Sequence, residues 1–214
     1  MPLANRVDPY GRLRAVAARG AWMGNRGVLH DDGKRVVAAW RVRRWIACVL
    51  EFRGRRREVF APRRYSELFF LDEATSLAAG HRPCAECRRE RYLQFRAAWA
   101  AGRGAAPESK PGADEIDRVL HADRIGRGGG KKTYRAPISS LPSGTIVEYA
   151  GRPHLLWDRR LRPWTFSGYG PPVAAPRAAR VDVLTPRSIV RAIRAGFVPQ
   201  VHGSAGGEAA RRGT

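Results

Sequence analysis

Residues 80–89 read Gly-His-Arg-Pro-Cys-Ala-Glu-Cys-Arg-Arg, and this stretch decides how the first half of the chain folds. Cys84 and Cys87 are separated by two residues, the spacing with which two thiolates hold one tetrahedral zinc ion. The residues that follow the pair have helical periodicity, and a helix is the usual support for such a knuckle. The stretch therefore predicts a structural zinc site with a helix behind it.

Two other interpretations share the Cys-x-x-Cys spacing. A redox pair of the thioredoxin type follows a strand in a βαβ unit, whereas a predicted helix and a Gly-x-x-Pro turn precede Cys84. Two unliganded thiols are the third alternative. We adopt zinc, which requires further ligands from elsewhere in the chain. Cys48 is the first candidate and His30 the second, and His81 and His121 are also available.

A longer run extends upstream from the cysteine pair. Residues 70–87 read Phe-Leu-Asp-Glu-Ala-Thr-Ser-Leu-Ala-Ala-Gly-His-Arg-Pro-Cys-Ala-Glu-Cys. This run resembles the zinc-binding domain of the Ada DNA-repair protein and related small zinc modules, which show Phe-x-Asp/Ser-x-x-x-Ala-x-x-Ala-Gly-Tyr/Phe-Arg-Pro-Cys-x-x-Cys. The family also has an upstream Cys pair or Cys/His pair, where this chain offers Cys48 and His30. The resemblance implies a zinc fold that sits on DNA. The whole chain also resembles bacterial proteins that carry the string of residues 80–88.

The secondary structure around the knuckle is predicted from local patterns. In residues 45–52, positions 46, 48, 50 and 52 share one apolar face, and together with residues 58–60 this segment indicates a β-hairpin. Asp72 is a good N-cap for a short helix that ends before Gly80. A second helix runs from the cysteine pair to about residue 101, and its apolar residues at helical spacing mark its buried face: Tyr92, Phe95 and Trp99.

The sequence of the second half predicts two more helices and a small β part. Residues 114–125 form a helix, and residues 145–149 and 154–157 form a hairpin. A strand at 181–184 leads to a last helix that Thr185 caps. The fold class is therefore α+β, with a zinc-knuckle N-terminal part of a β-hairpin and two helices, followed by a small α/β-hairpin part. The predicted division is a zinc-stabilised basic domain (1–101), a linker or loop (102–112), a helix with the β-hairpin and C-terminal helix (113–202), and a disordered tail (203–214).

The composition is strongly basic. Forty lysines and arginines stand against nineteen aspartates and glutamates, which gives a net charge of +21. A GC-rich genome favours arginine over lysine, but it does not explain the surplus of basic residues. Nucleic acid, DNA rather than RNA, is therefore the predicted partner, and an anionic membrane or mere solubility are the alternatives. With neither a signal-peptide pattern nor a stretch of about 20 apolar residues, we expect a cytoplasmic protein without a membrane partner.

Arginines interleaved with aromatic residues crowd the first predicted hairpin. Guanidinium groups grip phosphates and aromatic rings stack on bases, so the mixture suits nucleic acid. The candidate nucleic-acid-binding residues are Arg53, Arg55, Arg56, Arg57, Arg63, Arg64, Arg88 and Arg89. The last predicted helix adds a second basic face, with Arg187, Arg191 and Arg194 opposite its apolar residues.

The helix at 114–125 carries acids and a histidine on one side. Asp117 and His121 are the candidate catalytic residues, because carboxylates and an imidazole on one face can bind Mg²⁺ or act as general acid and base. The alternative is a solvated face whose acids favour the helix N-terminus. Three functions remain open: a zinc-containing nucleic-acid-binding protein, a metal-dependent nuclease or DNA-repair hydrolase, and a protein-interaction module. Whether the chain is an enzyme is left undecided.

Overall fold

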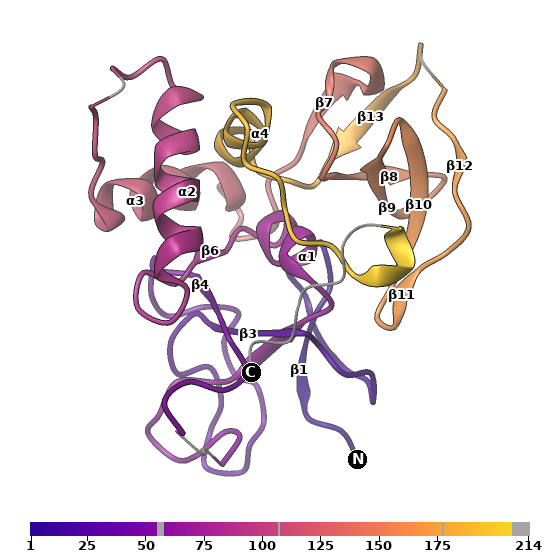
Figure 1. Cartoon of the computed structure of the whole chain (residues 1–214). Coiled ribbons are helices and arrows are strands. Elements are labelled where there is room, and N and C mark those ends of the chain that lie inside the picture. Colours follow the sequence, from indigo (N-terminus) through magenta and orange to yellow (C-terminus); the bar gives the residue numbers. More distant parts are fainter. Residues whose placement is uncertain (55–57, 107, 177, 207–214) are drawn as a thin grey trace.

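The molecule combines two β-sheets with four α-helices in the computed structural model, which describes residues 1–54, 58–106, 108–176 and 178–206 (Figure 1). The N-terminal sheet occupies the lower part of the view and the second sheet the upper right. Helix α1 lies between them, and α2 and α3 lie to the left. The predicted α+β class is confirmed, but the sheets are larger than the sequence suggests.

The first sheet has six strands in the order β2-β1-β5-β3-β4-β6. Its strands are β1 (Ala4–Val7), β2 (Leu13–Ala15), β3 (Trp22–Asn25), β4 (Ile46–Cys48), β5 (Leu68–Phe70) and β6 (Arg82–Pro83). The pairs β1–β5 and β4–β6 run parallel, and the other neighbours are antiparallel.

The predicted hairpin between residues 45–52 and 58–60 is wrong. β4 has β3 on one edge and β6 on the other, so neither edge is free for residues 58–60. Instead, Phe60 lies in a turn, where its N–H donates to the carboxylate of Glu67 at 2.9 Å and its ring stacks on His30. Residues 55–57, in the predicted turn, lie outside the described residues.

The helices of the first half follow the local sequence signals. α1 (Glu73–Ala78) begins after Asp72, whose carboxylate accepts from the backbone N–H of Thr75, and Gly80 ends it with a φ of +89°. α2 (Arg89–Ala101) buries the predicted face of Tyr92, Phe95 and Trp99. These predictions are confirmed. All six residues of α1 are buried, since both sheets pack against it.

The second sheet contains the predicted hairpin, confirmed as β8 (Thr145–Tyr149) and β9 (Arg152–Trp157). It continues to seven strands in the order β11-β10-β9-β8-β13-β7, with β12 beside β10. The remaining strands are β7 (Tyr134–Pro137), β10 (Arg160–Thr165), β11 (Gly168–Tyr169), β12 (Val173–Ala174) and β13 (Arg180–Val183), and the 3₁₀ helix η1 (Ile138–Ser140) follows β7. The expected small hairpin part is therefore a full sheet.

Two helices close the second half. α3 (Ala113–Arg124) buries Ile116 and Leu120. α4 (Arg187–Arg194) starts after Pro186, and Thr185 does not cap it, because the Thr185 hydroxyl accepts from the backbone N–H of Ile146 in β8. The 3₁₀ helix η2 (Gly203–Ala205) occupies the start of the predicted disordered tail, whose residues 207–214 lie outside the described part.

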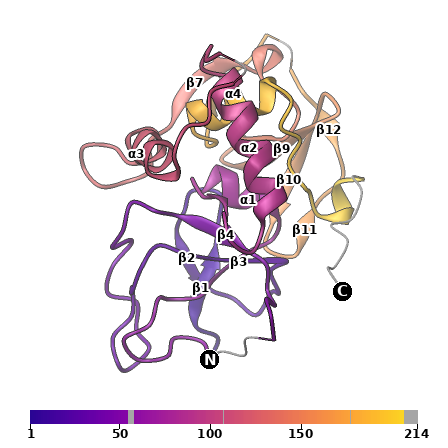
Figure 2. The same ribbon diagram turned by 60° about the vertical axis from the view of Figure 1, so that its left-hand side comes forward.

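One apolar cluster joins α1, α2, α3 and α4. It contains Leu77, Phe95 and Trp99 from the first half of the chain and Leu120 and Ile193 from the second. One hydrophobic core therefore contains residues from both sides of the segment 102–112. Figure 2 shows α2 and α4 side by side. Within the described residues, none of the helices has the length and apolar character needed to cross a membrane.

Candidate metal centre

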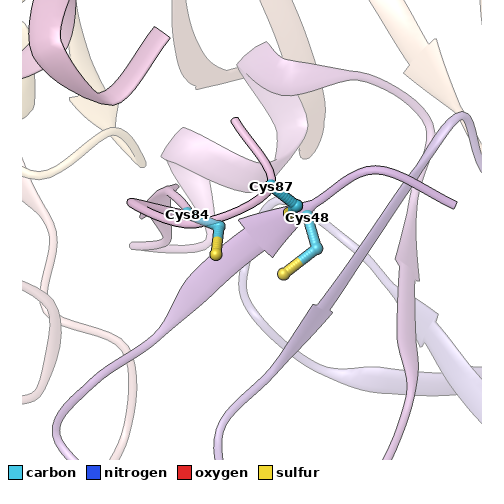
Figure 3. Close-up of side chains that lie close together, drawn as sticks. All are labelled: Cys48, Cys84 and Cys87. Carbon is cyan, nitrogen blue, oxygen red and sulfur yellow. The ribbon is translucent and has the colours of Figure 1, made fainter. Parts of the chain in front are cut away.

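Two neighbouring strands and one turn bring the three cysteines together. Cys48 is the last residue of β4, and Cys84 directly follows β6, which pairs with β4 in parallel. The backbone N–H of Cys84 donates to Ala47 at 2.9 Å and fixes this register. Cys87 lies in the turn that leads into α2 (Figure 3). A sequence separation of 36 residues is thus closed by one strand pair.

The spacing of the sulfur atoms fits one metal ion. The three Sγ atoms lie within 4.8 Å of one another. A tetrahedral ion with Zn–S bonds of about 2.3 Å holds its sulfur ligands about 3.8 Å apart, so only small side-chain adjustments are needed. Cys48 and Cys84 are buried and Cys87 is half-buried. The cluster can therefore hold a metal ion.

The three thiols shift one another's pKa values. Hydrogen bonds from the thiols of Cys48 and Cys87 lower the pKa of Cys84, and the backbone N–H groups of Cys87 and Glu86 add to this effect. The same contacts to Cys84 and Cys87, together with burial, raise the pKa of Cys48. A negative charge on one thiol therefore disfavours ionisation of the others, and a positive charge at the centre of the cluster would offset this effect. A bound divalent ion would supply that charge.

His30, the second candidate ligand, lies elsewhere. Its Nδ1 is 2.6 Å from the hydroxyl of Ser66, its Nε2 is 3.2 Å from the carbonyl of Ala61, and its ring stacks on Phe60. Both ring nitrogens of His30 therefore have hydrogen-bond partners in loops beside the first sheet. Among residues 1–54, 58–106, 108–176 and 178–206, the cysteine cluster has no fourth histidine, cysteine, aspartate or glutamate within reach.

The arginines that were candidates for nucleic-acid binding divide into three groups: exposed, outside the described residues, and buried. Arg53, Arg63, Arg64 and Arg89 are exposed, whereas Arg55, Arg56 and Arg57 lie outside the described residues. Arg88 is buried: its Nη2 donates to Glu73 of α1 at 2.7 Å, and its guanidinium lies 3.8 Å from the ring of Trp22. It holds α2 to α1, so it is not presented to a phosphate at the surface.

Asp117, a candidate catalytic residue, is buried in an ion pair. Its two carboxylate oxygens accept from Nε and Nη2 of Arg82 at 2.9 and 2.7 Å. Burial raises the pKa of Asp117, and Arg82 opposes that rise. His121 is partly exposed, contacts the ring of Trp40 edge-on, and lies 3.4 Å from a guanidinium nitrogen of Arg124. Arg82 thus occupies both carboxylate oxygens of Asp117.

Sequence reasoning missed a group of buried cations. Arg26, Arg82 and Arg124 are among the largest side chains that lie almost fully inside the protein. Arg26 and Arg124 lie on the ring of Trp45, at 4.2 and 4.0 Å from its centroid. No local pattern distinguishes these arginines from the many surface arginines of the chain. Only the partners supplied by the fold reveal them.

The chain matches no protein-family model, no curated protein and no solved structure. Its function is therefore argued from the geometry of its own side chains. The resemblance of residues 70–87 to the Ada zinc module stays a prediction.

Proposed function

We propose that this protein binds one zinc ion through Cys48, Cys84 and Cys87, and that the zinc stabilises a basic protein whose partner is nucleic acid. The observation that carries the proposal is the convergence of the three thiols within 4.8 Å. The zinc has a structural role, since it would tie the end of β4 to the turn that begins α2.

Thiolates are soft ligands, and three of them favour zinc over hard cations such as Mg²⁺ or Ca²⁺. The third cysteine also argues against a two-cysteine redox pair, because Cys48 comes from a separate strand and approaches the same point. Zinc is four-coordinate in nearly all protein sites. A water molecule or an external donor would complete the tetrahedron, given that the described residues supply three ligands.

What supports nucleic acid as the partner is charge and its placement. The net charge of +21 favours polyanions through counterion release. On α4, Arg187, Arg191 and Arg194 are exposed while Ile189 and Ile193 are buried. The helix therefore presents one basic face to solvent. Arg53, Arg63 and Arg64 form a second exposed basic group in the first half.

Metal content tests the first half of the proposal. Protein purified under reducing conditions without added metal should contain about one zinc per chain by elemental mass spectrometry. Cys48→Ser and Cys84→Ser should each lower that content, whereas the matched variant His30→Gln should retain it. Substoichiometric zinc in the wild type, or full zinc in Cys84→Ser, would overturn the metal assignment.

Salt dependence tests the second half. Binding of a labelled DNA duplex, followed by fluorescence anisotropy, should weaken steeply between low and moderate salt. Arg187→Gln/Arg191→Gln/Arg194→Gln should reduce the logarithmic salt slope by about 2 to 3, since each phosphate contact contributes about 0.9. The control removes the same charge from exposed positions at the β8–β9 and β9–β10 turns: Arg152→Gln, Arg159→Gln and Arg160→Gln.

A wild-type affinity that ignores salt would count against nucleic acid altogether. Equal losses in the α4 triple variant and in its control would show that net charge acts without a defined face. The same comparison with Arg53→Gln/Arg63→Gln/Arg64→Gln tests the second basic group.

A further inference from the structure

A cavity of about 740 Å³ opens beside the first sheet, away from the three cysteines. Its walls come from the turn between β1 and β2, the loop at residues 36–40, and the segment that follows α3. Gly129 and Gly130 form part of one edge, and a Cβ at either position would have no atom within 4 Å. The entrance is therefore not narrowed by side chains at these two positions.

Arg26 lies in the wall of this cavity and is 1% exposed. Its Nε donates to Nε2 of His81 at 3.1 Å, and its Nη1 donates to the carbonyls of Gly11 and Ala39. Its Nη2 has no hydrogen-bond partner in the part of the chain that the structure describes. A buried cationic N–H group without an acceptor is costly in a protein interior. An acceptor that enters from the cavity would satisfy this group.

Further cations surround the same space. Lys131 lines the cavity and its ammonium donates to the carbonyl of Ala78, while Arg12 lies exposed at the rim. Arg124 is buried behind the wall, on the ring of Trp45. Burial lowers the pKa of Lys131 to about 7, and repulsion from Arg26 and Arg124 adds to the effect. These groups are held together against their mutual repulsion.

The acidic side chains near this group do not neutralise it. Asp8 attracts Arg26 and Lys131, but one of its oxygens accepts from the backbone N–H of Arg12 and the other lies 3.6 Å from Arg14. Asp117 attracts Arg124 while both its oxygens are bound to Arg82. Glu148 accepts from the hydroxyl of Tyr10 at 2.6 Å. The cavity therefore keeps an excess of positive charge.

We propose that this cavity binds a phosphomonoester group, with Nη2 of Arg26 and the ammonium of Lys131 as its donors. A phosphate dianion matches several cations and accepts hydrogen bonds in several directions, and guanidinium groups suit it geometrically. The volume is that of a site for a nucleotide-sized ligand. Tyr10 and Trp40 contribute apolar wall for the organic part of such a ligand.

The burial of Arg26 decides which kind of phosphate can bind: one at the end of a strand or one within a strand. Arg26 is almost fully buried, so the phosphodiester of an intact duplex would not reach it, whereas a terminal phosphate or a free nucleotide would. This site goes beyond the proposed function, because it uses neither the cysteines nor the basic face of α4.

Calorimetric titration tests the proposal with four probes: inorganic phosphate, adenosine monophosphate, and one short single strand with a 5′-phosphate or a 5′-hydroxyl. Wild-type protein should bind inorganic phosphate, and both nucleotide probes that carry a phosphomonoester should bind at least as well. Preference for the 5′-phosphorylated strand over the nucleotide identifies a strand end, and the reverse order identifies a free nucleotide.

Lys131→Gln should weaken phosphate binding by about tenfold, the loss of one charge-assisted contact. The matched control is Lys132→Gln, which removes the same charge from the next residue and should change the affinity less than about twofold. Arg26→Gln serves as a second variant, and circular dichroism confirms that each variant folds.

No binding of inorganic phosphate or the nucleotide at millimolar concentration would overturn the proposal, as would equal losses in Lys131→Gln and Lys132→Gln. Zinc content and salt-dependent duplex binding are measured on the same preparations. A failure of those two properties alone would leave the phosphate result standing.

Discussion

The buried pair of Arg82 and Asp117 leads to the sharpest prediction about stability. Their side chains are 2% and 4% exposed, and two charge-assisted hydrogen bonds join them. Asp117→Ala removes both hydrogen-bond acceptors and leaves the guanidinium of Arg82 buried without its counterion. The cationic Arg124 is close enough to repel it.

Two routes to the magnitude agree. Hydrogen bonds to charged groups contribute about 1.5 to 3 kcal/mol each, which gives about 3 to 6 kcal/mol for two. Breaking one partner out of a buried ion pair costs about 3 to 5 kcal/mol. The free energy of unfolding of Asp117→Ala should therefore fall by about 4 kcal/mol, a large part of the stability of a typical domain.

Urea unfolding followed by circular dichroism measures this loss. Asp114→Ala, an exposed acid one turn earlier on α3, is the matched control and should change the free energy by less than about 0.5 kcal/mol. Arg82→Met/Asp117→Leu should recover most of the stability, because an apolar pair replaces the ion pair. A loss below about 1 kcal/mol in Asp117→Ala would refute the reasoning.

Three further predictions follow from contacts in the same region. Gly80→Ala should lower the free energy of unfolding by more than the roughly 1 kcal/mol that is typical when a left-handed glycine is replaced, because a Cβ at residue 80 would lie 2.5 Å from Cδ of Arg124. Urea unfolding measures this loss. The control is Gly104→Ala, since Gly104 has a similar φ and a Cβ there would have open space around it. His81 is fully buried, and burial followed by repulsion from Arg26 lowers its pKa well below the usual value. Below about pH 6.5 the imidazole of His81 therefore takes up a proton in the unfolded chain but not in the folded protein. The free energy of unfolding should fall as the pH drops below this value, by up to about 1.4 kcal/mol per pH unit. A free energy of unfolding that does not change with pH in the wild type, or the same slope in His81→Leu, would contradict this. Removal of the metal by a chelator should lower the melting temperature of the wild type and leave that of Cys84→Ser unchanged, as seen by calorimetry.

The helices were predictable because their signals are local. Asp72 caps α1 through its own neighbour Thr75, and Tyr92, Phe95 and Trp99 recur at helical spacing, so no knowledge of distant residues is needed. Cys48 was a sound first choice of ligand for a similar reason, since few thiols exist to choose from. The structure brings its Sγ within 4.8 Å of the sulfur atoms of Cys84 and Cys87.

Strand pairing in the first sheet depends on contacts that no window of sequence contains. β4 has three residues and β6 has two, and their parallel pairing joins segments separated by a helix and several loops. Residues 58–60 had the more obvious hairpin spacing, but the edges of β4 are taken by partners from elsewhere. Short strands with non-local partners carry too little periodicity to identify them.

The sequence does not show which arginines are buried. An arginine side chain is normally exposed, so every arginine counted toward a basic surface. Yet Arg88 pairs with Glu73, and Arg26 and Arg124 sit on Trp45 inside the protein. The charge total therefore overstates what the surface presents, and part of it belongs to the cavity.

Residues 80–84 connect the proposed metal site with the proposed phosphate site, because each of these residues contacts a different group in or beside the two sites. Their contacts are, in order, the stem of Arg124, the guanidinium of Arg26, the carboxylate of Asp117, the paired strand β4, and the sulfur cluster. β4 itself starts just after Trp45, on which the buried cations rest, and ends at Cys48. A metal ion bound by Cys48 and Cys84 would hold the strand pair at one end, and an anion bound to Arg26 would hold it at the other. Either ligand would stabilise the same two strands, so each should strengthen the binding of its counterpart by an equal factor.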